Sequence, residues 1–189
     1  MKRYALLIAA AAPLALAACT SETNAADSAT EAGDAAAAIT AEEVEAAQKA
    51  WGEGIVTIGK AFTDEGDFKA AADEHIKKFY AYGADATVLF KPTLTSDDQF
   101  RETFDEALSY FIGTEGTEDK GFAIKPWTAV RWENNGTVVD SDSAMAMGNY
   151  YFTDTDGNDT KVEYSFGYVR DENGDLKINL HHSSVPFGG

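Results

Sequence analysis

The chain has 189 residues, of which 44% are hydrophobic and 12% aromatic, enough apolar side chains to fill the core of one soluble domain. Its 32 acidic residues outnumber its 15 basic residues, and the formal net charge at pH 7 is −17. Such a surface repels polyanions, so the composition excludes a protein that binds nucleic acid through its phosphates.

The first eighteen residues have the pattern of a secretory signal rather than of a folded element. Lys2 and Arg3 precede a short apolar run that ends in the sequence Leu-Ala-Ala-Cys at residues 16–19. A basic start, a short apolar core and small residues before a cleavage site are typical of a signal peptide, and the run is short for a membrane span. The last four residues also resemble the lipobox of bacterial lipoproteins, whose cysteine becomes the lipid-modified first residue.

Cys19 is therefore expected to be a lipid anchor, and the alternative is an ordinary cleaved signal with an incidental cysteine. Cys19 is the chain's one cysteine, so its lipidation would leave no thiol for a disulfide, a metal or a nucleophile. The expected location is the bacterial cell envelope, with the protein facing the periplasm and the outer membrane favoured over the inner. The membrane would be contacted only through the lipid.

A flexible tether and then one folded domain are expected after the anchor. Residues 20–39 consist mainly of Ala, Ser, Thr and acids without an aromatic residue, and such a segment cannot bury enough apolar surface to fold. The lipidated cysteine and the tether take up residues 19–40, and residues 41–189 remain for a single domain.

Three helices are expected in the first half of this domain. Thr40 and Glu43 have the spacing of a capping box, and apolar residues follow at steps of three and four as far as Phe62. A second helix is expected over residues 67–82 and a short strand over residues 86–93, which is limited by a proline. Ser96 and Gln99 have capping-box spacing too, and predict the start of a third helix whose apolar stripe is Phe100, Phe104, Ala107, Leu108 and Phe111.

The second half has the two-residue periodicity of β-strands. Four strands are expected, with the sequences "TAVRWE", "SAMAMGNYYFTD", "KVEYSFGYVR" and "LKINLHHSS". Asn134-Asn135-Gly136, Asp156-Gly157-Asn158 and Glu172-Asn173-Gly174 lie between them and are typical of hairpin turns.

Helices followed by hairpin-linked strands predict an α+β fold, in which three N-terminal helices pack on a curved, mainly antiparallel sheet. This element order is similar to that of the nuclear-transport-factor-like superfamily, which includes SnoaL-like enzymes and the association domain of calcium/calmodulin-dependent kinase. The expected architecture is a cone with a pocket at its open end, and fold alone does not give the function.

The histidines do not form an obvious metal site. His181 and His182 are adjacent on an expected strand, so their side chains point to opposite faces. His75 lies near the apolar stripe of the second helix, where a packed histidine is the simpler interpretation. The acidic segment at residues 154–159 has its glycine at the fourth position, so it fits a hairpin tip and not an EF-hand loop.

The C-terminal "NLHHSS" is the strongest candidate for a functional site. Strict alternation places His182 and Ser184 on the same face as the apolar residues of this strand, and therefore in the pocket. A bulge near the strand end would exchange them for His181 and Ser183. The remaining interpretation is a polar strand end that reaches solvent.

The chain is similar to the iota class of carbonic anhydrases in several segments, which together span about residues 51–187. These are "VLFKPT", "FRETFDEALSYF", "DKGFAIKPWTAVRWEN", "AMGNYYF", "VEYSFGY" and "HHSSVP". The resemblance implies the cone fold and a pocket formed by Thr93, Tyr110 and the pair His182 and Ser184, or, in the other register, His181 and Ser183.

The activity that the resemblance implies is the reversible hydration of carbon dioxide to bicarbonate. Hydroxyl groups would then relay the proton of the attacking water, with the histidine as proton shuttle. The expected dry wall of the pocket is Phe90, Phe100, Phe104 and Trp127. No metal is expected to be required, and zinc or manganese is the alternative.

A non-catalytic module is the competing hypothesis, because cone folds also serve as small-ligand-binding or dimerisation domains. A homodimer is expected in either case. The outward residues of the strands at residues 144–152 and 161–170 include Met and aromatic side chains, and one face of an antiparallel sheet must be wetted or covered.

Overall fold

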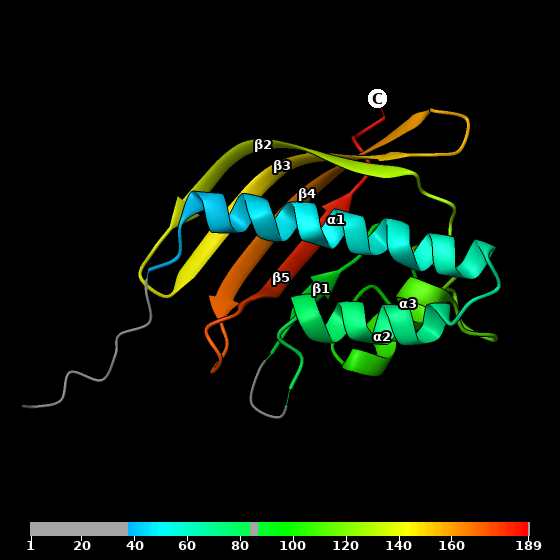
Figure 1. The fold of residues 1–189 in the computed structure, drawn as a ribbon, viewed down its shortest axis with the longest axis horizontal. Helices are drawn as coiled ribbons and strands as arrows, with labels where there is room; N and C mark the ends of the chain where they lie inside the picture. Colours follow the sequence, from blue (N-terminus) through cyan, green and yellow to red (C-terminus); the bar gives the residue numbers. More distant parts are fainter. Residues whose placement is uncertain (1–37, 84–86, 189) are drawn as a thin grey trace, which may run out of the picture. The chain divides into compact units, whose positions relative to one another are not determined.

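The computed structural model describes residues 38–83 and 87–188, and within them three helices pack on one face of a five-stranded sheet (Figure 1). The expected leader, Cys19 and nearly all of the expected tether lie outside the described residues. The elements are α1 (Ala41–Thr63), α2 (Phe68–Phe79), β1 (Leu89–Lys91), α3 (Phe104–Ile112), β2 (Ala129–Val139), β3 (Ser143–Thr153), β4 (Asp159–Arg170) and β5 (Leu176–Ser184).

The sheet has the strand order β1-β5-β4-β3-β2, in which β1 runs parallel to β5 and every other pair is antiparallel. The expected α+β class with a mainly antiparallel sheet is thus confirmed. The parallel pair matters for the site, because it brings the segment after β1 beside the end of β5.

α1 begins where the sequence predicts. The Thr40 hydroxyl accepts a hydrogen bond from the Glu43 backbone N–H, and the Glu43 carboxylate accepts one from the Thr40 N–H. The capping box thus satisfies two N–H donors at the start of the helix. The apolar stripe of the helix then lies against the sheet, with Trp51 and Ile55 fully buried.

α3 begins later than expected, and the predicted cap at Ser96 and Gln99 is wrong. The Ser96 N–H donates instead to the carboxylate of Glu118, which lies more than twenty residues away in the sequence. The capping box forms between Thr103 and Glu106. A tertiary acceptor therefore outcompetes the local cap.

The interpretation of residues 134–136 as a hairpin turn is also wrong, since they form a β-bulge inside β2. Gly148 of β3 lies opposite the bulge, where a Cβ atom would stand 2.2 Å from the Glu133 carbonyl oxygen. The glycine makes room for the extra residue of the bulged strand. The turn that joins β2 to β3 comes after Val139, whereas the turns expected at Gly157 and Gly174 are confirmed.

α2 ends at Phe79, three residues earlier than predicted. Tyr80 is extended and forms an isolated parallel bridge with Ile178 of β5. This bridge carries the Tyr80 side chain out of the helix and into the space between the helices and the sheet, where it is buried.

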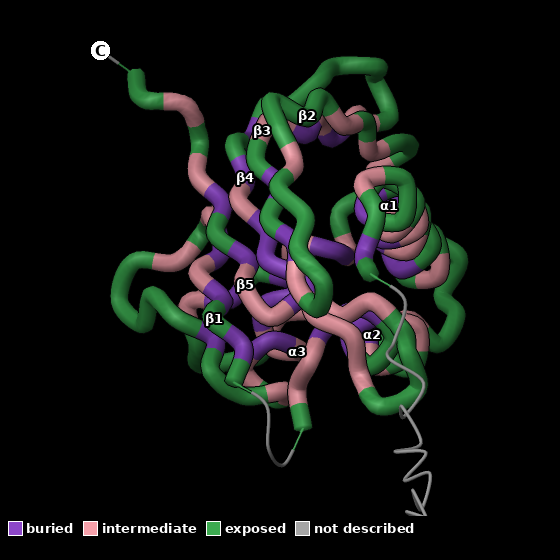
Figure 2. The backbone as a smooth tube through the Cα atoms, turned by 90° about the vertical axis from the view of Figure 1, so that its left-hand side faces the viewer, coloured by how far each residue is buried: buried purple, intermediate pink, exposed green. Residues whose placement is uncertain are grey.

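The core lies between the sheet and the helices, and Figure 2 shows its buried segments gathered there. Aromatic rings dominate it, and several of them surround Trp51 in edge-on contacts. The largest fully buried side chains include Trp51, Phe90, Phe111, Phe152, Phe166 and Tyr168. At one end this aromatic layer opens into a cavity.

Candidate active site

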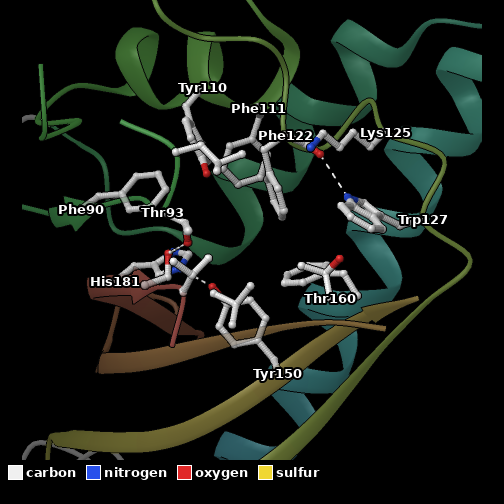
Figure 3. Close-up of a pocket in the computed structure, with 15 residues that line it drawn as sticks. Phe90, Thr93, Tyr110, Phe111, Phe122, Lys125, Trp127, Tyr150, Thr160 and His181 are labelled. Carbon is white, nitrogen blue, oxygen red and sulfur yellow. Dashed lines mark hydrogen bonds between the residues drawn. The ribbon is translucent and has the colours of Figure 1, made fainter. Parts of the chain in front are cut away.

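A cavity of about 120 Å³ lies between the sheet and the α3 side of the domain (Figure 3). Most of its wall is apolar and includes Phe90, Phe111, Phe122, Trp127, Phe152 and Val162. Its hydroxyl and imidazole groups come from Thr93, Tyr110, Tyr150, Thr160, His181 and Ser183. It is smaller than a pocket for a drug-sized ligand and suits a molecule of a few atoms with some water.

Two hydroxyls meet directly in this cavity. The Thr93 hydroxyl donates to the Ser183 hydroxyl oxygen across 2.8 Å, as the dashed line in Figure 3 marks. Tyr110 of α3 also lines the cavity, and its hydroxyl points from the helix toward Thr93 in Figure 3. The structure therefore brings together three hydroxyls that the sequence places up to 90 residues apart.

The expectation that His182 and Ser184 face the cavity is wrong, and His181 and Ser183 take their places. His181 and Ser183 are buried at the cavity, whereas the His182 side chain is exposed. The Ser184 hydroxyl lies on the outer face of the sheet and donates to the Glu163 carboxylate across 3.2 Å. The alternative register left open by the sequence is the one that the structure adopts.

A β-bulge causes this exchange. Gly167 of β4 pairs with Leu180 and Tyr168 pairs with Ile178, so Asn179 is an extra residue in β5 that shifts the alternation by one. A Cβ atom on Gly167 would lie 2.8 Å from the Asn179 side-chain oxygen. A glycine inside a strand often marks a bulge, so Gly167 was the sequence signal that could have given the register.

Two buried tyrosines that the sequence did not single out hold the His181 ring. The Tyr80 hydroxyl lies 2.8 Å from His181 Nδ1, and the Tyr150 hydroxyl lies 3.4 Å from Nε2. Phe90 stacks on the ring with the centroids 4.5 Å apart. Burial lowers the pKa of His181 well below its usual value, and the neighbouring His182 adds to this effect. His181 is therefore neutral at pH 7.

The tyrosine hydroxyls at the cavity stay protonated at neutral pH. Burial raises the pKa of Tyr110 above its usual value, and hydrogen bonds from the Leu94 and Thr93 backbone only partly offset this. Burial also raises the pKa of Tyr150, against a smaller opposing effect of the Ser183 hydroxyl. Both phenols can therefore donate hydrogen bonds to an oxygen atom placed in the cavity.

Half of the expected apolar wall is correct. Phe90 and Trp127 line the cavity, and Trp127 is held by a hydrogen bond from its indole N–H to the Phe122 carbonyl oxygen. Phe100 and Phe104 do not line it. Phe100 lies in the exposed segment before α3, and Phe104 at the start of α3 packs edge-on against Tyr82 instead.

The residues that the structure describes contain no group of three or more His, Cys, Asp or Glu side chains placed to hold a metal ion. His75 is a core residue, as expected, with Phe79 and Trp51 rings against it. Asp154 accepts hydrogen bonds from the backbone N–H groups of Asp156 and Asn158, which makes its segment a hairpin tip. Among the described helices, none is long and apolar enough to cross a membrane.

Comparison with known proteins connects this cavity to a reaction. Residues 42–185 match the family model described as metal-independent carbonic anhydrase. The chain is 42% identical over 155 residues to the metal-independent carbonic anhydrase of Nostoc sp. strain PCC 7120, a match that covers 79% of this chain and 75% of the relative.

Solved structures agree with this relationship. The crystal structure of a cyanobacterial iota-carbonic anhydrase complexed with bicarbonate is 41% identical and has a TM-score of 0.77, over 80% of this chain and 95% of that one. A putative calcium/calmodulin-dependent protein kinase II association domain from Xanthomonas campestris has a TM-score of 0.52 at 22% identity, over 78% and 89% of the two chains, and shares the fold alone. The chain belongs to the metal-independent, or iota, carbonic anhydrases and is a carbonate dehydratase.

Proposed function

We propose that this carbonic anhydrase hydrates carbon dioxide in the cavity beside Thr93 and Ser183. The observation that carries the proposal is their hydroxyl–hydroxyl contact of 2.8 Å at the polar end of a cavity whose other walls are aromatic. Carbon dioxide is apolar and suits the aromatic walls, whereas the bicarbonate formed from it needs hydrogen-bond donors. The bicarbonate in the related cyanobacterial structure supports this assignment.

The reaction joins a water oxygen to the carbon of carbon dioxide and releases one proton. As the bond forms, the water proton passes to the Ser183 or Thr93 oxygen, which gives up its own hydrogen along the chain of hydroxyls and finally to solvent. Charge develops at the same time on the two oxygens of carbon dioxide. Tyr110, whose hydroxyl remains protonated, is placed to stabilise that charge as a hydrogen-bond donor.

Metal dependence provides the test. The family is metal-independent, so stopped-flow measurements of carbon dioxide hydration should give the same rate before and after exhaustive chelation, with the metal content measured in both samples. A rate that falls with chelation and returns when zinc or manganese is added would overturn the hydroxyl mechanism.

We further propose a homodimer formed through the outer face of the sheet. Met145 and Met147 of β3 are 59% and 56% exposed, and Val138 at the end of β2 is 64% exposed. Apolar side chains gathered on one sheet face favour burial against a second copy. Light scattering should give twice the monomer mass, and Met147→Glu should shift the protein toward the monomer. A monomeric wild type would refute the interface.

Lipid anchoring through Cys19 is a proposal of the same kind. It is supported by the leader and by the Leu-Ala-Ala-Cys sequence and places residues 41–189 in the bacterial envelope, facing the periplasm. Cys19→Ala should release the protein from membranes while its carbon dioxide hydration rate is unchanged. A variant that still sediments with membranes after a high-salt wash would disprove the anchor.

A further inference from the structure

A chain of three buried side chains leads from the helical layer to the cavity. The Trp51 indole N–H donates to the Tyr80 hydroxyl oxygen across 3.2 Å, and the same hydroxyl lies 2.8 Å from His181 Nδ1. The exposed fractions of the three residues are 0%, 2% and 3%. No bulk water therefore competes for these hydrogen bonds.

The donors and acceptors among these three side chains determine where the hydrogen of the Tyr80 hydroxyl points. The indole N–H of Trp51 can only donate, so it occupies a lone pair of the Tyr80 oxygen. The Tyr80 ring also contacts the rings of Tyr82, Phe90 and Phe111. Among the residues that the structure describes, His181 Nδ1 is the one acceptor within hydrogen-bond distance of the Tyr80 hydroxyl.

The alternative tautomer of His181 would leave this hydrogen without a partner. If Nδ1 carried a hydrogen, both Nδ1 and Trp51 would donate to Tyr80, and the Tyr80 O–H would have no acceptor among the described residues. A buried donor without an acceptor costs its full desolvation free energy. The arrangement therefore favours an unprotonated Nδ1 and a hydrogen on Nε2.

We propose that Tyr80, itself oriented by Trp51, is a positioning residue that fixes His181 as the neutral Nε2–H tautomer. The Nε2–H then donates toward Tyr150, whose hydroxyl lies 3.4 Å away at the cavity wall. His181 acts as a hydrogen-bond donor that orients Tyr150, and it does not take up the proton of the attacking water. This inference rests on the proposed location of the reaction, and it replaces the proton-shuttle role expected from the sequence.

Nitrogen-15 NMR tests the tautomer directly in the wild-type protein. Long-range spectra of the imidazole rings distinguish a nitrogen that carries a hydrogen from one that does not, and His181→Gln identifies the His181 signals among the three histidines. The expected result at pH 7 is a hydrogen on Nε2 and none on Nδ1, with no titration of this ring between pH 5 and 8. A hydrogen on Nδ1, or a charged ring, would overturn the proposal.

The matched variants are Tyr80→Phe and Tyr164→Phe. Tyr164 is also a buried tyrosine with hydrogen-bonded hydroxyl, but its partners are Gln48 and Asn134 and it does not line the cavity. Tyr80→Phe should give a mixture of His181 tautomers and a kcat lowered about tenfold with KM within about twofold. Tyr164→Phe should leave both tautomer and kcat as in the wild type.

Two results would contradict the positioning role. One is a Tyr80→Phe variant with wild-type tautomer and kcat, and the other is an equal loss of kcat in Tyr164→Phe, which would indicate a general loss of packing. If Tyr80→Phe does not fold, the His181 tautomer measured in the wild-type protein still tests the proposal. Failure of the proposed reaction site would look different, because Ser183→Ala would then keep full activity whatever the His181 tautomer is.

Discussion

Thr93 and Ser183 are 90 positions apart in the sequence, yet the Thr93 hydroxyl donates to the Ser183 oxygen across 2.8 Å. The parallel pairing of β1 with β5 produces this contact, because Lys91 pairs with His182 and the next residues on each strand continue toward the cavity. A three-residue strand thus determines which hydroxyls meet.

Loss of either hydroxyl should abolish most of the activity. We expect Ser183→Ala and the nearly isosteric Thr93→Val to lower carbon dioxide hydration by about 100-fold, the scale for one positioned proton-transfer or oxyanion group. Ser184→Ala, which changes a hydroxyl on the outer face of the sheet, is the matched control and should be close to wild type. Stopped-flow rates that fall for Ser184→Ala and not for Ser183→Ala would contradict this site.

The bulge in β5 should be as important as the residues it positions. Gly167→Ala would place a Cβ 2.8 Å from the Asn179 side-chain oxygen and 2.9 Å from the Leu180 Cβ, so the strands must move apart. We expect a loss of about 1–3 kcal/mol in the free energy of unfolding and reduced activity, since His181 and Ser183 follow the bulge.

Gly136→Ala is the control for this change, because a Cβ at Gly136 would have no atom within 4 Å. Chemical denaturation and the stopped-flow assay on both variants provide the measurement. Equal stability of the two variants would show that the strands absorb the extra methyl group without strain.

Elements whose signals are local could be predicted from the sequence alone. The capping box at Thr40, the period-two strands and the turns at Gly157 and Gly174 each depend on residues within a few positions of one another. The α+β class follows from their order. These features are determined by backbone sterics and by the alternation of polar and apolar side chains, which can be read without the tertiary structure.

The features that were predicted wrongly depend on residues far away in the sequence. The register of β5 is set by Gly167 on the neighbouring strand, and the segment at Ser96 is held by Glu118. Tyr80 reaches the site only because it leaves α2 to bridge Ile178. In each case a tertiary contact overrides a local pattern. The family resemblance pointed to Thr93 and Tyr110, whereas strict alternation along β5 favoured the wrong His-Ser pair.

A buried ion pair should stabilise the segment that carries Thr93. Arg101 is almost fully buried and contacts the Asp119 carboxylate at 2.5 Å, while the other Asp119 oxygen accepts from Ser109 of α3. Arg101→Met would leave the Asp119 charge buried without its partner. We expect it to lower the free energy of unfolding by about 3–5 kcal/mol.

The double variant Arg101→Met, Asp119→Leu should recover a large part of that loss, because no isolated charge remains. Lys49→Met removes one partner of the solvent-exposed pair with Glu53 and should change stability by less than about 1 kcal/mol. Urea denaturation of the three variants measures these differences. An Arg101→Met effect no larger than that of Lys49→Met would mean that the pair contributes little.

His75 should make stability depend on pH. Burial lowers the pKa of His75 from 6.5 to about 3, with a smaller contribution from the charge of Lys78, and neither ring nitrogen has a hydrogen-bond partner among the described residues. The unfolded chain therefore binds a proton near pH 6.5 that the folded chain does not bind until about pH 3. The stabilisation by the neutral ring is complete above pH 6.5 and is lost progressively as the pH falls toward 3.

Between pH 8 and pH 5 this difference should lower the free energy of unfolding by about 2 kcal/mol, at 1.36 kcal/mol for each pH unit below 6.5. His75→Phe removes the titrating ring in a pocket that is already aromatic, so the variant should lose about 2 kcal/mol less than the wild type over the same range. The compared quantity is the change in the free energy of unfolding between the two pH values of each protein. Any destabilisation by overpacking of the larger ring is the same at both pH values and cancels. His181 is also buried and neutral, so its titration lowers the free energy of unfolding in both proteins as the pH falls. Identical changes in wild type and variant, measured by urea denaturation at pH 5 and pH 8, would show that His75 is not the group that titrates.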